Sequence, residues 1–318
     1  MKRNSSQTET TTPRLVKEWI RVATRRLLGA KLCFDNGLQT AEAEAEYLLF
    51  HVLALPFEEA RRYQNRQVTE EEAIKFLHLL EQRIQKRTPV HYLTNEAFFA
   101  GLRLYVDERV LIPRSRIELL IDDPEGLAEL VPASGVKNIL DLCTGSGCLA
   151  FALALLYPDA RVDGSDLSAD ALAVAKINQQ RLKLEGRVRL VQSDLFAGLQ
   201  GRKYDLIVSN PPYVPRSTLA KLPTEFQREP ALALDGGVDG LILVENILRQ
   251  AVDHLTPHGC LICEVGDETE KILRNKYPGL FLEWLEFYFG GSGVFMIDRQ
   301  GLWQGLGRES RLGMGVSK

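Results

Sequence analysis

The feature that most constrains this fold is a regular alternation of short apolar runs with helical segments after Val136. Seven runs have the composition of buried strands: 137–143, 160–167, 187–195, 204–210, 259–266, 281–288 and 293–299. Strands that alternate with helices form mostly parallel sheets, because each parallel connection must cross one face of the sheet. We therefore predict an α/β fold with a mostly parallel, doubly wound sheet of seven strands.

A different period precedes this pattern. Between Leu15 and Ile84, apolar residues recur every three to four positions, which is typical of amphipathic helices. Thr69, followed by three acidic residues, resembles a helix N-cap with a favourably charged first turn. We predict a disordered tail over 1–13 and a bundle of about four helices over 14–88. Alternation over 89–115 predicts a hairpin connector, with turns at 100–101 and 107–108, and residues 116–318 form the second domain.

Composition restricts the class of protein. Apolar residues make up 45% and charged residues 25% of the chain, which is ordinary for a globular protein. No apolar stretch approaches the ~20 residues of a membrane span, and the polar start lacks the apolar core of a signal peptide. These features predict a cytoplasmic protein without a membrane partner.

Charge is distributed unevenly. Residues 1–105 carry a net charge of +3 and the rest carry −6. The positive part fits either a solvated helical face or a surface that docks on an acidic partner such as a ribonucleoprotein.

Cysteine and histidine spacing gives little support to a metal site. Cys260 and Cys263 form a C-x-x-C pair within an apolar run, and no second pair has zinc spacing. His254 and His258 are four residues apart, but Pro257 breaks any helix that could place them on one face. We predict no metal ligands.

Acidic residues end each of the first three predicted strands: Asp141, Asp166 and Asp194. After the first strand, Gly145 and Gly147 make a turn in which the backbone can approach a ligand closely. Acids at strand ends are also common helix N-caps, and the turn alone fits a dinucleotide as well. An acid beside the glycine turn favours a cationic ligand over a pyrophosphate, however. This charge pattern favours S-adenosylmethionine over NAD.

The fourth predicted strand ends in Asn210, Pro211, Pro212 and Tyr213. In this setting the chain resembles the class I methyltransferases, and in particular the branch that methylates amino groups. The resemblance implies a sheet in the strand order 3-2-1-4-5-7-6 with the last strand antiparallel, and S-adenosylhomocysteine as the product. It also implies a set of cofactor-binding residues: Asp141, Leu142, Thr144, Gly145, Gly147, Asp166, Leu167, Asp194, Leu195 and Asn210.

The four residues of this motif suit the methylation of an amide or aromatic amine. Such a nitrogen is a poor nucleophile because its lone pair is delocalised. Proline has no N–H, so the turn exposes acceptors: the Asn210 side-chain oxygen and the Pro211 carbonyl can hold both N–H bonds of the substrate. We predict that Asn210 and Pro211 are catalytic, and that Pro212 and Tyr213 complete the substrate-binding loop, the tyrosine ring covering the planar group.

The motif alone leaves the substrate open among adenine, guanine and glutamine. The acidic balance and the lack of a basic patch disfavour sequence-specific DNA binding. Residues 83–115 and 229–241 resemble the protein glutamine N5-methyltransferases, which also carry a helical domain in front. That resemblance assigns substrate recognition to the helical domain.

Two branches of this family compete, one acting on release factors and one on large-subunit ribosomal protein three. Residues 93–102 and 113–115 are similar to the ribosomal branch, but Arg116 stands where that branch has proline, and "IELL" after it is similar to the release-factor branch. We predict methylation of a glutamine in ribosomal protein three, free or in the assembling ribosome. The alternatives are a release factor, a nucleic-acid adenine or guanine, and a non-catalytic role as an assembly factor.

Overall fold

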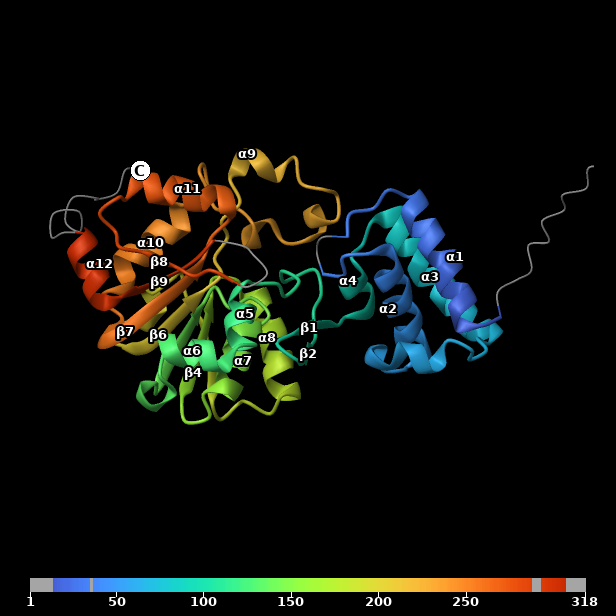
Figure 1. The fold of residues 1–318 in the computed structure, drawn as a ribbon, viewed down its shortest axis with the longest axis horizontal. Coiled ribbons are helices and arrows are strands. Elements are labelled where there is room, and N and C mark those ends of the chain that lie inside the picture. The colour runs from blue at the N-terminus through green and yellow to red at the C-terminus, as the bar shows by residue number, and fades with distance from the viewer. Residues whose placement is uncertain (1–13, 35–36, 288–292, 307–318) are drawn as a thin grey trace, which may run out of the picture. The chain divides into compact units, whose positions relative to one another are not determined.

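The computed structural model describes residues 14–34, 37–287 and 293–306, and they divide into two compact units (Figure 1). The first unit ends at Thr94 and the second begins at Asn95. The predicted connector, 89–115, spans this boundary, and the predicted tail, 1–13, lies outside the described residues.

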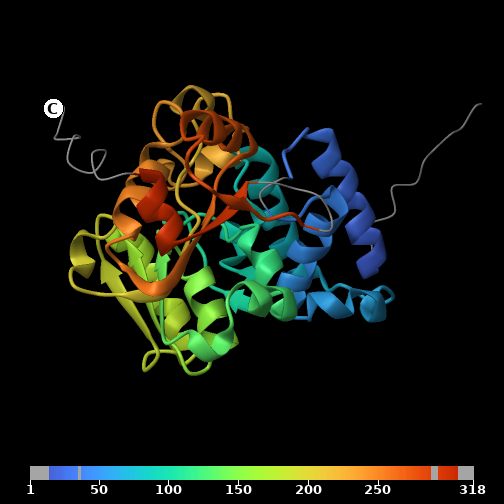
Figure 2. The same cartoon turned by 60° about the vertical axis from the view of Figure 1, so that its left-hand side comes forward.

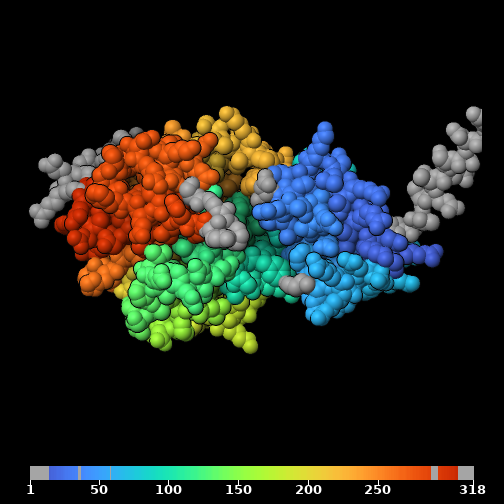
Figure 3. Space-filling model, in the orientation of Figure 1, coloured from blue at the N-terminus to red at the C-terminus, as the bar shows by residue number. Residues whose placement is uncertain are grey.

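The first unit consists of helices that pack around one apolar core. Its elements are α1 Val16–Gly29, α2 Ala41–Leu53, a 3₁₀ helix Phe57–Tyr63, α3 Glu70–Lys86 and α4 Val90–Thr94. The α-helices α1, α2 and α3 are long, whereas α4 and the 3₁₀ helix are short. In the space-filling view, the described residues of this unit are coloured from blue to cyan (Figure 3).

Local sequence explains where these helices begin and what they bury. On α1, Trp19, Ala23 and Leu27 are buried at the spacing that the sequence predicts. The predicted N-cap at Thr69 is confirmed: its hydroxyl accepts the Glu72 N–H, and the Glu72 carboxylate accepts the Thr69 N–H.

A short hairpin opens the second unit. β1 (Ala97–Phe99) pairs with antiparallel β2 (Leu102–Leu104) around Ala100 and Gly101, whose φ angles are +46° and +71°. Positive φ at both positions matches the twist of a two-residue hairpin, and the turn predicted at 100–101 is confirmed. The second predicted turn, at 107–108, is not a hairpin turn, because the β-turn from Asp107 to Val110 leads into a loop rather than a returning strand.

The second unit is built on a seven-stranded sheet. Its strands are β3 Asn138–Leu142, β4 Arg161–Asp166, β5 Val188–Gln192, β6 Tyr204–Ser209, β7 Leu255–Glu264, β8 Glu283–Trp284 and β9 Val294–Asp298. They lie in the order β5-β4-β3-β6-β7-β9-β8, with β9 antiparallel to both of its neighbours. The predicted strand order and fold class are confirmed. The sixth strand is shorter than predicted, because only two residues of 281–288 pair with β9, and Tyr288 lies outside the described residues.

Helices cover both faces of this sheet (Figures 1 and 2). Side chains alternate along the strands, so Ile139 faces a core with α7 (Cys148–Leu156) while Leu140 faces one with α10 (Ile242–Ala251). The helix α12 (Arg299–Leu306), red in Figure 2, packs its Leu302 and Leu306 into the second core beside β7 and β9. The helices of this unit are α5 Ile117–Ile121, α6 Pro124–Leu130, α7 Cys148–Leu156, α8 Ala169–Arg181, α9 Arg216–Leu219, α10 Ile242–Ala251, α11 Asp267–Lys276 and α12 Arg299–Leu306.

The parallel strands place their carboxyl ends along one edge. Leu142 of β3 is paired with Ser165 of β4 and with Ser209 of β6, so the loops that follow these strands are neighbours. In open α/β sheets, ligands bind in the crevice outside this edge.

Candidate active site

A glycine turn connects β3 to α7. Gly145 and Gly147 have φ angles of +55° and +85°, which favour glycine. A Cβ at Gly147 would lie 2.2 Å from the Phe151 ring, so the turn also needs its small size for helix packing. The chain thus brings bare backbone to the edge of the sheet, where a ligand can approach it.

Asp166, at the end of β4, is held by backbone donors from two loops. Its Oδ2 accepts the N–H of Gly145 at 2.9 Å, and its Oδ1 accepts the N–H of Ser168 at 2.9 Å. Burial raises the pKa of Asp166, and the backbone hydrogen bonds oppose that shift. An ionised carboxylate accepts about four hydrogen bonds, so both oxygens keep lone pairs for the hydroxyls of a ribose.

Asp141 lies behind the glycine turn. It is 1% exposed, and its Oδ2 accepts the Thr144 hydroxyl at 2.5 Å and the Ala150 N–H at 2.9 Å. Its Oδ1 is buried and has no hydrogen-bond partner among the described residues. Burial raises the pKa of Asp141 to about 7. Asp141 therefore anchors the turn and the first turn of α7, and it leaves one unsatisfied acceptor beneath the cavity.

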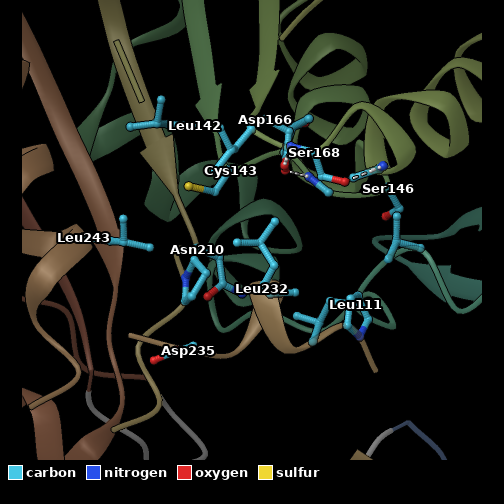
Figure 4. Close-up of a pocket in the computed structure, with 18 of the residues that line it drawn as sticks. Leu111, Leu142, Cys143, Ser146, Asp166, Ser168, Asn210, Leu232, Asp235 and Leu243 are labelled. Carbon is cyan, nitrogen blue, oxygen red and sulfur yellow. Dashed lines mark hydrogen bonds between the residues drawn. The ribbon is translucent and has the colours of Figure 1, made fainter. Parts of the chain in front are cut away.

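Asn210 follows β6 at the centre of the site. Ser209 fixes the strand end by donating its hydroxyl to the Leu142 carbonyl at 2.7 Å. The Asn210 Nδ2 donates to the Arg114 carbonyl at 3.1 Å. A carbonyl can only accept, so this bond sets the orientation of the amide and leaves Oδ1 as the acceptor that the side chain offers to the cavity. Figure 4 shows Asn210 between Asp166 and Asp235.

A buried carboxylate, Glu264 at the end of β7, ties this motif to the preceding loop. Its Oε1 accepts the Tyr213 hydroxyl at 3.0 Å, and its Oε2 accepts the Ser115 hydroxyl at 2.5 Å and the Arg116 N–H at 2.9 Å. Glu264 is 4% exposed, and burial raises its pKa. Arg116 stands where the ribosomal branch has proline, and a proline at this position would have no N–H to donate to Glu264.

The segment 229–241 packs directly on the motif. A Cβ on Gly236 would lie 2.7 Å from the Tyr213 backbone, and one on Gly240 would lie 2.4 Å from the Tyr213 carbonyl oxygen. Val214 donates its N–H to the Leu234 carbonyl of this segment and accepts the Gly236 N–H, both at 2.9 Å. The Arg114 guanidinium donates to the Glu229 carboxylate at 2.9 Å. The glycines therefore let two loops meet closely and hold the motif in place.

These loops surround a cavity of about 560 Å³ at the edge of the sheet. Nine predicted site residues line it: Leu142, Thr144, Gly145, Asp166, Leu167, Asp194, Leu195, Asn210 and Pro212. Asp141, Gly147, Pro211 and Tyr213 do not line it. The first two support the glycine turn, while Pro211 is buried and the Tyr213 hydroxyl is bound to Glu264.

Sequence reasoning missed several lining and supporting residues. Leu111, Cys143, Ser168, Leu232 and Leu243 line the cavity, because loops far apart in the chain meet there (Figure 4). Glu264 could have been found, since it ends a predicted strand just as Asp166 does. No sequence signal pairs it with Ser115 and Tyr213.

The cysteine and histidine pairs do not join this site. Cys260 and Cys263 are buried in β7, and burial raises the pKa of the Cys260 thiol to about 12. His254 stacks on Phe196, with ring centroids 4.6 Å apart, while His258 is exposed. Within the ranges that the structure describes, no group of three or more His, Cys, Asp or Glu side chains could hold a metal ion, and no helix is both long and apolar enough to cross a bilayer.

Two parts of the chain match known family models. Residues 124–237 match the family model "Methyltransferase small domain", and residues 18–94 match "PrmC N-terminal domain". A solved methyltransferase from Pyrococcus furiosus aligns with a TM-score of 0.46 at 20% identity, covering 63% of this chain and 89% of that one.

Curated relatives extend over nearly the whole chain. The ribosomal protein uL3 glutamine methyltransferase of Neisseria meningitidis is 43% identical over 307 residues, which are 96% of this chain and 98% of the relative. The protein of the same name from Burkholderia pseudomallei is 42% identical over 91% of this chain and 96% of its own length. At this identity and coverage, the chain belongs to the family of ribosomal protein uL3 glutamine methyltransferases.

Proposed function

We propose that this protein transfers a methyl group from S-adenosylmethionine to the side-chain nitrogen of a glutamine in large-subunit ribosomal protein uL3. The observation that carries this proposal is the Asn210 amide, whose Nδ2 is bound to the Arg114 carbonyl so that its oxygen remains the acceptor at the cavity.

The residues around the cavity fit the proposed cofactor. Asp166 offers spare lone pairs to a ribose, Asp194 lines the same wall, and the turn at Gly145 offers bare backbone. The unsatisfied Asp141 oxygen beneath the turn favours a cationic ligand, as S-adenosylmethionine is. When bound, this cofactor supplies an electrophilic methyl group.

The motif residues would then bind and orient the substrate amide. We propose that the Asn210 Oδ1, at the cavity, accepts one of its N–H bonds, and that the carbonyl of the buried Pro211, next in the chain, accepts the other at the cavity wall. This arrangement directs the nitrogen lone pair away from both acceptors and into the cavity. The same contacts strengthen as positive charge develops on the nitrogen. No general base is required early, because the methylated nitrogen is acidic enough to release its proton to water. Glu264 and the segment 229–241 keep these acceptors in position.

The identity of the substrate rests on the curated relatives, whose names specify uL3. We further propose that the helical unit, predicted at 14–88, recognises the substrate protein, that 89–115 connects it, and that 116–318 carries the methyl transfer. This substrate implies a cytoplasmic reaction on free uL3 or on the assembling ribosome.

Methyl transfer to purified proteins tests this proposal. The full chain is incubated with methyl-labelled cofactor and either uL3 or a release factor, and the labelled peptides are identified by mass spectrometry. We expect one methylated glutamine in uL3 and at least about 10-fold slower transfer to the release factor, the scale of specificity that about 1.4 kcal/mol provides. Label that appears only in the release factor, or only in nuclease-sensitive material, would refute the proposal.

A further inference from the structure

A second cavity lies at the opposite edge of the sheet, at the amino ends of β3 to β6. It has a volume of about 360 Å³ and is lined by residues from each of these strand starts. We call it the amino-edge pocket. β4 spans six residues at about 3.3 Å each, so this pocket lies about 20 Å from the candidate active site.

The lining of the amino-edge pocket is strongly basic. Five cationic residues line it, namely Arg161, Arg187, Arg189, Arg202 and Lys203, against two acidic residues. Its net charge of +3 stands within a unit, residues 95–318, that carries −6 overall. Repulsion among these cations raises the free energy of the empty pocket, and a bound anion would relieve it. A cluster of cations in an acidic unit therefore favours an anion-binding site over a solvated charged surface.

One buried acid organises two of these cations. Asp163 is 7% exposed, and Arg189 binds both of its oxygens, at 2.9 and 3.0 Å. Arg202 and the Tyr204 hydroxyl bind Oδ2 at 2.9 and 2.7 Å. The acid is therefore fully engaged. Each guanidinium has five N–H donors, so most of the donors of Arg189 and Arg202 remain unused while both side chains stay about half exposed.

The other cations have donors that the protein does not satisfy. Among the described residues, the Arg161 side chain has no hydrogen-bond or ion-pair partner. The Nε of Arg187 is buried and has no hydrogen-bond partner in the described part of the chain. The Arg187 Nη2 donates to the carbonyls of Ala154 and Tyr157, and the Lys203 Nζ donates to the Asp253 carbonyl at 2.7 Å. Neutral carbonyls therefore hold these two cations, and their positive charge is left for an anion. Guanidinium groups match the geometry of phosphate oxygens in particular.

We propose that the amino-edge pocket binds the phosphate backbone of RNA. Several cations that extend across the starts of neighbouring strands suit a chain of phosphates better than a single anion. The choice of RNA rests on the proposed function, because a ribosomal protein meets its enzyme in an RNA-rich setting. The separation of the two cavities lets RNA bind here without closing the candidate active site.

Fluorescence anisotropy with a labelled single-stranded RNA of about 20 nucleotides tests this proposal on the full chain over a range of salt concentrations. The double variant Arg161→Gln/Lys203→Gln removes two exposed cations that do not contact Asp163. Loss of two phosphate contacts should lower the slope of log Kd against log salt by about 1.4 and raise Kd at about 0.1 M salt by about 10-fold. The matched variant Lys176→Gln/Lys271→Gln makes the same charge change at exposed positions outside the pocket and should bind like the wild type.

The proposal would be overturned by no binding of RNA by the wild type, by equal effects of the two double variants, or by complete competition by millimolar inorganic phosphate. Retention on anionic phospholipid vesicles in place of RNA would overturn it as well. Methyl transfer to free uL3 is measured in parallel and should be unchanged in both double variants. Absence of methyl transfer in the wild type would count against the proposed function, whereas the anisotropy result is independent of it.

Discussion

Replacement of Asn210 by alanine removes the acceptor on which the proposed reaction depends. The substitution deletes Oδ1 at the cavity and the Nδ2 bond to the Arg114 carbonyl. Loss of one contact that strengthens in the transition state should lower kcat by about 10²–10³, which corresponds to about 2.7–4 kcal/mol. Loss of the bond to Arg114 should cost only about 1 kcal/mol of folding stability, so the variant should remain folded.

Single-turnover transfer of a labelled methyl group to uL3 measures the chemical step, and calorimetry measures cofactor affinity. Most of the effect should fall on the transfer rate, with cofactor affinity largely retained, because Asp166 and the glycine turn are untouched. Ser209→Ala is the matched control. It deletes a neutral hydrogen bond of similar length, from Ser209 to the Leu142 carbonyl, at the neighbouring position.

The control should lose about 1 kcal/mol of stability and keep its transfer rate within about five-fold. The reasoning would be refuted if Asn210→Ala kept a rate within about five-fold of the wild type. Equal losses of rate in the two variants would also refute it, since the effect would then come from disturbance of the strand end.

Three further substitutions test the residues that hold the Asn210 motif and the glycine turn in position. Glu264→Gln leaves one of three buried donors facing an amide NH₂. We expect it to lower the free energy of unfolding, measured by thermal unfolding, by about 1–3 kcal/mol and to reduce kcat. Tyr213→Phe should have the smaller effect on both quantities. Gly236→Ala places a Cβ 2.7 Å from the Tyr213 backbone and should cost about 1–3 kcal/mol together with activity, whereas Gly135→Ala, which has open space, should do neither. Asp141 has a folded pKa of about 7 against an ordinary 3.8, so its contribution to stability is present below about pH 4 and is lost as pH rises through about 7. In the absence of cofactor, the melting temperature of Asp141→Asn minus that of the wild type should therefore increase as the pH rises from about 5 to about 8. A difference in melting temperature that stays constant over this range would contradict the raised pKa.

The order of elements was predictable because hydrophobic periodicity is a local property. Alternating runs from β3 to β9 set the number of strands, and crossover connections restrict how parallel strands can be arranged. The resemblance to a known family supplied the order of the strands. Periodicity could not set the length of β8, because pairing with β9, rather than apolar composition, decides where a short edge strand ends.

Local chemistry also determined the central residues of the site. The glycine turn, each acid at a strand end and the Asn210 motif are each recognisable from a few neighbouring residues, and parallel strands bring their carboxyl ends to one edge. For this reason Asp166, Gly145 and Asn210 were found without knowledge of the tertiary structure.

Only the tertiary structure decided which groups surround and orient these residues. Glu264 receives hydrogen bonds from Ser115 and Tyr213, which are 149 and 51 residues away, and no local pattern encodes such a pairing. It also placed Asp141 behind the turn and gathered five cations at the opposite edge of the sheet, which sequence spacing had not suggested. The sequence by itself determined the strands and the chemistry at their ends, because both depend on neighbouring residues. The packing of the loops decided which groups surround and orient the site residues, because contacts between distant segments depend on how the whole sheet and its helices are arranged.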